Sequence, residues 1–263
     1  MSNTPDISLF SMALCFLLLV IPAAMSYYLK LGVTRELVTA VIRMSVQLLL
    51  VGVFLEYLFD LNNPVVTTVW LIVMITFASY SVIKNSVLSR KLLLLPTLGA
   101  LLLTTLTILA YFNAFIIRLD NIFDARFAIA IGGMLLGNAM RGTIVGVNDF
   151  YRTIKRDSNR YLYTLAQGAT MFEAGSPYVR NSLNAAVKPS LASMATMGIV
   201  FLPGMMTGQI IGGSSPVVAI KYQIAIMIVI FTATILSIGL SILFTMRASF
   251  DEFGILRKEI FTA

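Results

Sequence analysis

The sequence predicts an all-helical integral membrane protein that crosses the bilayer seven times. Hydrophobic residues make up 58% of the 263 residues, charged residues make up only 12%, and the mean hydropathy is +0.90. A soluble domain carries about twice that charged fraction. A water-soluble globule of this length cannot bury so much apolar surface, so a polytopic membrane protein is predicted. The composition also excludes disordered, collagen-like and disulfide-rich secreted classes.

Seven apolar stretches are long enough to cross the hydrocarbon core, which needs roughly 20 residues per helix. They cover residues 7–29, 37–59, 65–83, 92–117, 127–148, 191–212 and 222–246. The first stretch exceeds a signal-peptide core and has no basic segment before it, so we expect it to be retained. We expect residues 1–263 to form one transmembrane domain with a cytoplasmic loop at about 149–190. That loop is too short for a nucleotide-binding domain, and the sequence has no GxxxxGK[ST] motif.

Basic residues predict the orientation of the chain. Alternate connections hold 14 Lys and Arg residues on one side of the expected membrane and 3 on the other. Because positive charges collect in cytoplasmic loops, the N-terminus is expected outside and the C-terminus in the cytoplasm. The net charge of +7 is therefore explained by basic cytoplasmic loops. Contact with membrane lipid is expected, and a nucleic-acid partner is not.

Few residue types that catalyse reactions or bind metals occur in the chain. Cys15 is the single cysteine and histidine is absent, which excludes disulfides, thiolate clusters, imidazole zinc sites and Ser-His-Asp triads. Four of the fourteen methionines, Met194, Met197, Met205 and Met206, surround the sixth expected span. Thioethers bind soft cations such as Cu(I), but methionines in apolar helices are more often gap fillers. A metal site is therefore left open.

Polar residues inside the expected spans are candidates for a transport pathway. Arg43 and Gln47 lie four apart on the second span, Asn138 and Arg141 lie three apart on the fifth, and Glu56 lies near an outer end. Each pair shares one helix face. The arginines either snorkel to the cytosolic interface or give a cytosolic vestibule a positive potential.

Glycine and proline mark two further features of the spans. Two pairs and one triplet of glycines have a spacing of four residues, which allows close helix packing within one bundle, at a homodimer seam or at a surface that slides during transport. The glycines with this spacing are Gly133, Gly137, Gly142, Gly146, Gly204, Gly208 and Gly212. Pro203 interrupts the sixth expected span and predicts a kink there. With Gly204, Met205 and Met206 it forms either a tolerated kink or a hinge beside a pathway.

The 149–190 loop has helical character of its own. Residues 149–160 extend the fifth helix, and residues 161–174 carry apolar side chains three or four apart. We expect Gly175-Ser176-Pro177 to break this helix, and a second helix at 178–188 to end before Pro189. The resulting knob either inserts into a groove of a partner or rests on the membrane surface.

Several blocks of this region resemble the FetB (YbbM) family of ABC transporter permeases, to which plant aluminium-tolerance membrane subunits are similar. The resemblance is dense over residues 132–224 and looser before them. Its most specific blocks are Leu202-Pro203-Gly204-Met205-Met206 and Ala219-Ile220-Lys221-Tyr222-Gln223.

This resemblance implies a permease subunit that pairs with a separate cytosolic ATPase, on which ATP and Mg bind. It also implies two copies of the chain per complex, the bacterial inner membrane, and export linked to iron or another metal. Plant members suggest UDP-glucose or another anionic metabolite as the alternative. In this reading residues 165–174 are a coupling helix, whose candidate contacts are Leu165, Gln167, Gly168, Ala169, Thr170, Phe172 and Glu173. A stand-alone channel or secondary transporter remains the alternative class.

Overall fold

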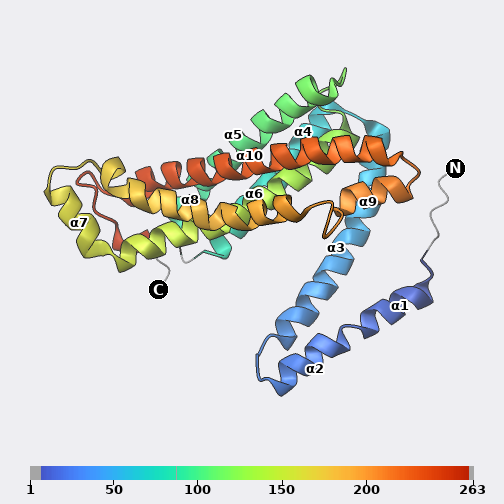
Figure 1. The fold of residues 1–263 in the computed structure, drawn as a ribbon, viewed down its shortest axis with the longest axis horizontal. Helices are drawn as coiled ribbons and strands as arrows, with labels where there is room; N and C mark the ends of the chain where they lie inside the picture. Colours follow the sequence, from blue (N-terminus) through green and yellow to red (C-terminus); the bar gives the residue numbers. More distant parts are fainter. Residues whose placement is uncertain (1–6, 87, 261–263) are drawn as a thin grey trace.

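The computed structural model describes residues 7–86 and 88–260, and its regular elements are all helices (Figure 1). Six stretches are long and apolar enough to cross a membrane, which confirms an all-helical membrane protein. These six comprise α1 (Leu9–Leu17) with α2 (Val20–Tyr28), α3 (Thr34–Leu61), α4 (Pro64–Lys84), α5 (Arg90–Tyr111) with the π-helix Phe112–Ile117, α6 (Ala125–Arg156) and α10 (Pro216–Ser249).

Polar caps at one end of the bundle begin or end the long helices. Asn63 and Asp124 accept hydrogen bonds from the first turns of α4 and α6, and Pro64 occupies the first position of α4. Such residues satisfy backbone N–H groups that have no partner within the helix. Asn62, which ends α3, also accepts from the backbone N–H of Ala125 at 3.0 Å and donates to Asp124 at 3.1 Å. This cap therefore ties the end of α3 to the start of α6.

The centre of the molecule is a bundle in which α10 packs along α5 and α6, while α4 and α8 cover α6 (Figure 1). Its core includes Leu136, Phe150, Ile238 and Ile242, each at most 5% exposed. A Cβ atom at Gly146 would lie 2.5 Å from Cγ2 of Ile238. The absence of a side chain there lets α6 and α10 approach closely, so part of the glycine pattern serves packing within one chain.

The N-terminal helices stand apart from this bundle. In Figure 1, α3 leaves the bundle at a steep angle and the α1–α2 segment folds back beside it. Thr34 donates a hydrogen bond to the Ser26 hydroxyl at 2.9 Å across the α2–α3 turn. Leu58 is the buried hydrophobic residue among the described parts of these three helices. Most of their apolar surface is therefore left for lipid or another subunit.

The sixth expected span, residues 191–212, is not one helix. α8 (Met171–Thr196) ends inside it, an irregular segment follows, and α9 (Gly204–Ile211) begins after Pro203. Gly198 has a positive φ of 86° and donates to the carbonyl of Phe201 at 2.9 Å, which turns the chain sharply. Pro203 lacks a donor and forces Leu202 out of the helical region. The expected kink is therefore a full break.

The break changes the count of continuous membrane helices from seven to six. α8, the break and α9 together run beside α10 in the opposite direction (Figure 1). This interrupted segment occupies the place in the chain where a seventh continuous helix was expected. The seven-fold crossing and the positions of the two termini stay predictions.

The expected extension of the fifth helix into the 149–190 loop is confirmed as far as Arg156, but the expected division of the rest of the loop was wrong. α7 (Ser158–Ala166) ends before Gly168, so residues 161–174 are two helices joined by a turn. α8 then continues through Gly175-Ser176-Pro177 and through Pro189 without a break. Ala174, Gly175 and Tyr178 are buried, and Ser182 donates to Asp149 of α6 at 2.9 Å. Packing against α6 holds α8 in a helix despite its prolines, because tertiary contacts can override local propensity.

Candidate functional site

The predicted coupling region forms a corner at one end of the bundle, which we define as α7 and the turn into α8, residues 158–173. α7 crosses the end of the bundle close to the C-terminal segment (Figure 1). Tyr161 anchors it: its hydroxyl donates to the carbonyl of Gly254 at 2.8 Å, and its ring contacts those of Tyr178 and Phe250. Burial raises the pKa of Tyr161 to about 12. The corner is thus fixed to both α8 and the chain's end.

Two aromatic side chains and one leucine are exposed on the outward surface of the corner, among polar residues such as Arg160 and Gln167. Tyr163 is 66% exposed, Phe172 46% and Leu162 41%. Leu165 packs inward instead, within 3.5 Å of the Cβ position of Gly254, and Ala169 is half-buried. The sequence pattern placed Leu162 and Leu165 on one apolar face, and Tyr163 was not among the predicted contacts. Helical periodicity alone could not separate these residues, because the inward face of α7 is set by the contacts of Tyr161 with distant segments.

The polar candidates of the corner shape its turn. Gly168 has a φ of +93° and lies in the turn with Gln167, outside any helix. Thr170 and Glu173 form a capping box: the Thr170 N–H donates to Oε2 of Glu173 at 2.8 Å, and the Glu173 N–H donates to Oγ1 of Thr170 at 3.3 Å. The Thr170 N–H holds the pKa of Glu173 below its ordinary value. Both residues therefore begin α8, as the spacing T-x-x-E could have indicated.

A second feature is a crevice of 590 Å³ between α3, α4 and α6. Arg43 and Gln47 line it together with Gly137 and Met140, so the expected common face of Arg43 and Gln47 is confirmed. No acidic residue lines it among the described part of the chain.

The other polar candidates stay apart from that crevice. Arg141 is exposed and donates to the carbonyl of Gly137 at 3.3 Å and to Oδ1 of Asn138 at 3.2 Å. Asn138 in turn donates to the carbonyl of Met134 at 2.8 Å. Glu56 is exposed on α3. These side chains therefore bond within their own helix or face outward.

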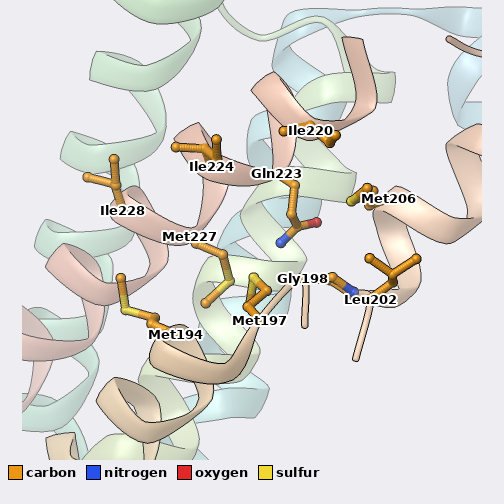
Figure 2. A pocket seen from close by; sticks show the side chains of 11 residues that line it. Met194, Met197, Gly198, Leu202, Met206, Ile220, Gln223, Ile224, Met227 and Ile228 are labelled. Carbon is orange, nitrogen blue, oxygen red and sulfur yellow. The ribbon is translucent and has the colours of Figure 1, made fainter. Parts of the chain in front are cut away.

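The third feature is a cavity of 410 Å³ where α8 breaks, shown in Figure 2. Pro203 and Met206 line it, whereas Gly204 and Met205 do not; Met205 packs instead against the core. Gln223 of α10 points into the cavity, is 7% exposed, and its Oε1 has no hydrogen-bond partner. The sequence had not selected Gln223 as a site residue.

Metal chemistry based on acidic or thiolate clusters is not evident in residues 7–86 and 88–260. No group of three or more His, Cys, Asp or Glu side chains gathers in these ranges. Oxygen, nitrogen or sulfur donors for a cation would have to come from amides, carbonyls, hydroxyls or thioethers.

Comparison with known proteins places the chain in a family. A profile described as "Uncharacterised protein family (UPF0014)" matches residues 9–250. The chain is 29% identical over 250 residues to the "Probable iron export permease protein FetB" of Escherichia coli (strain K12), a match that covers 95% of each chain. It is 31% identical over 229 residues to "Protein ALUMINUM SENSITIVE 3" of Arabidopsis thaliana, covering 86% of this chain and 82% of the relative. No solved structure matches. The chain therefore belongs to the UPF0014 family of membrane proteins, as its resemblance to FetB-like permeases indicated.

Proposed function

We propose that the chain is the permease subunit of an ABC exporter that acts in metal homeostasis and is driven by a separate cytosolic ATPase. The name of the Escherichia coli relative, a probable iron export permease, supports a transport role in metal homeostasis. The sequence has no phosphate-binding loop, so ATP and Mg are assigned to the partner. The localisation that follows is the cytoplasmic membrane of a bacterium.

The corner carries this proposal. It connects the C-terminal end of α6 to the start of α8, and these two long helices run the length of the bundle (Figure 1). It is held rigidly by Tyr161 and presents Tyr163 and Phe172 outward. A short anchored helix with exposed aromatic side chains suits a groove of a partner protein. Movement of that partner would be passed directly to α6 and α8. ATP-dependent export by vesicles that hold both subunits tests the proposal, and export by the chain alone would contradict it.

Two copies of the chain per complex complete the proposed assembly. A Cβ atom at Gly137 or Gly208 would have no heavy atom within 4 Å in one chain. The N-terminal helices also leave a long apolar surface uncovered. Both features support a seam between copies, where glycines allow close helix contact.

Orientation is tested by labelling with a membrane-impermeant thiol reagent. Cys15 is exposed, so every variant should carry Cys15→Ser. Asn63, the N-cap of α4, and Asn159, on α7, are both exposed. We expect Asn63→Cys to be labelled in sealed cells and Asn159→Cys only after permeabilisation, because the basic loops lie inside. Labelling of both in sealed cells would contradict the topology.

A second candidate function is export of an anionic metabolite, favoured by the crevice that holds Arg43 and Gln47 without a lining acid. If the substrate is an anion or a chelated metal, Arg43→Ala with Arg141→Ala should weaken its binding. The loss should be larger at low than at high salt, because ions screen the attraction. Binding of radiolabelled substrate at two salt concentrations measures this. Unchanged binding would mean that the arginines only snorkel to the interface.

A further inference from the structure

The cavity at the break between α8 and α9 is unusually rich in sulfur. Four of its eleven lining residues are methionines: Met194, Met197, Met206 and Met227. The whole chain has only 14 methionines in 263 residues, so they are concentrated here several-fold. A gap-filling methionine closes space in a core, yet these four border 410 Å³ of empty volume. Their thioethers are therefore available to a ligand.

We propose that this cavity binds a soft monovalent cation, Cu(I) or Ag(I), through methionine thioethers and the Gln223 amide. Figure 2 shows Met197 and Met227 on one side of the Gln223 amide and Met206 on the other. Thioether sulfur is a soft, neutral donor that selects soft ions. Three of these sulfurs come from three separate segments, the start of the break, α9 and α10, so the ion would hold the broken region together.

Gln223 gives independent support for a ligand. It is 93% buried by its 7% exposure, it points into the cavity, and its Oε1 accepts no hydrogen bond. An unsatisfied buried acceptor costs free energy, of order 1–3 kcal/mol. A bound cation would offer that oxygen a partner, and the remaining lining is apolar or glycine apart from the four thioethers.

Among the residues that the structure describes, the cavity lining has no charged residue to neutralise a bound ion, and this favours an ion of low charge. No Asp or Glu borders the cavity within the described ranges. The cost of transferring an ion into a medium of low dielectric grows as the square of its charge, so a divalent ion costs about four times and a trivalent ion about nine times as much as a monovalent one. Al(III) is a hard ion that prefers oxygen ligands, and the borderline ion Fe(II) is bound by imidazole, carboxylate or thiolate ligands rather than by neutral thioethers. The cavity therefore favours Cu(I) or Ag(I) over both.

This inference deepens the proposed export function, on which the biological use of the site rests, but binding itself can be measured without a partner or transport. The probe is Ag(I), which needs no reductant, added to the purified full-length chain in competition with a chelator. All proteins should carry Cys15→Ser, because the exposed thiol would itself bind Ag(I). The test variant combines Met197→Leu, Met206→Leu and Met227→Leu, a nearly volume-conserving change.

A matched control removes three thioethers elsewhere. Met12, Met25 and Met44 lie on α1, α2 and α3 and are 44–56% exposed, so their combined change to leucine leaves the cavity intact. Loss of groups that only support a metal's ligands costs roughly 10- to 100-fold in affinity, so loss of the cavity thioethers should cost at least that. The control should bind as the parent does. Equal affinity of both triple variants would overturn the proposal.

A measurement on the unmutated methionines guards against misfolding of the test variant. Peroxide oxidises exposed thioethers to sulfoxides. Ag(I) should slow oxidation of the partly exposed Met197 and Met227 in the Cys15→Ser chain and leave Met12 and Met44 unaffected, as followed by peptide mass spectrometry. Zn(II), which does not react with peroxide, should protect none of them. Absence of protection by Ag(I) would overturn the cation site and leave ATP-driven export untouched, whereas failure of ATP-driven export would leave the binding result standing.

Discussion

Alanine at Gly146 is expected to lower the free energy of unfolding by about 1–3 kcal/mol, the usual cost of overpacking a filled core. Its Cβ would lie 2.5 Å from Cγ2 of Ile238, which is fully buried on α10. Cγ2 sits one bond from the β-carbon of a β-branched side chain, so it cannot swing away. The helices α6 and α10 would have to separate. Thermal unfolding of the purified chain in detergent measures the effect.

Gly239→Ala is the matched control, since it adds the same methyl group to α10, the helix that Gly146 contacts, at a position where no heavy atom of the described residues lies within 4 Å. There alanine should be neutral, or stabilising by up to about 1 kcal/mol through its helix propensity. Ile238→Ala should also make Gly146→Ala less harmful, and residues in direct contact show coupling of about 0.5–3 kcal/mol in such a cycle. Equal stability of the Gly146 and Gly239 variants would contradict the close α6–α10 contact.

Removal of the two exposed aromatic rings at the corner is expected to uncouple the chain from the proposed ATPase. Interface hot spots are worth at least about 2 kcal/mol each, and 1.4 kcal/mol is about tenfold. Tyr163→Ala with Phe172→Ala should therefore lower the affinity for the ATPase by well over tenfold. Neither side chain is buried, so the fold should stay intact. Titration of ATPase activity with the permease in vesicles measures the loss.

The control for this experiment is Tyr57→Ala. Tyr57 is 65% exposed, almost the same as Tyr163 at 66%, but lies near the end of α3. It should leave the affinity unchanged. Normal stimulation by the double corner variant would place the ATPase contact elsewhere. A bulky substitution such as Gly168→Trp would test the ATPase contact less well. Any side chain at a φ of +93° strains the backbone by about 1–3 kcal/mol.

The membrane helices could be predicted because the hydropathy of about 20 consecutive residues adds up along each helix. Residues 65–83 and 222–246 fall within α4 and α10, whose apolar length outweighs any error at single positions. The corner could not be predicted in the same way. Gly168 was interpreted as a helical contact, but its positive φ depends on the turn around it. Pro177 was interpreted as a helix end, but the buried Tyr178 and the Ser182–Asp149 bond hold α8 together.

The site residues divide along similar lines. The four-residue spacing of Arg43 and Gln47 predicted a shared face, and both line one crevice. The spacing of Asn138 and Arg141 predicted proximity as well, but could not show that their hydrogen bonds stay within α6. Nothing in the sequence indicated that Gln223 lines a cavity, because the cavity is formed by the break between α8 and α9, in a different segment of the chain. Contacts between distant segments are what local spacing cannot supply.

Coupling of the chain to an ATPase through the corner is tested most directly by ATP hydrolysis in vesicles. Hydrolysis is measured with the purified ATPase alone, with the wild-type chain added, and with the Tyr163→Ala, Phe172→Ala chain added. We expect the wild-type chain to raise hydrolysis and allow ATP-dependent metal export, and the corner variant to do neither at the same protein concentration. Export by the wild-type chain without ATP, or equal stimulation by both chains, would contradict a permease coupled to its ATPase through this corner.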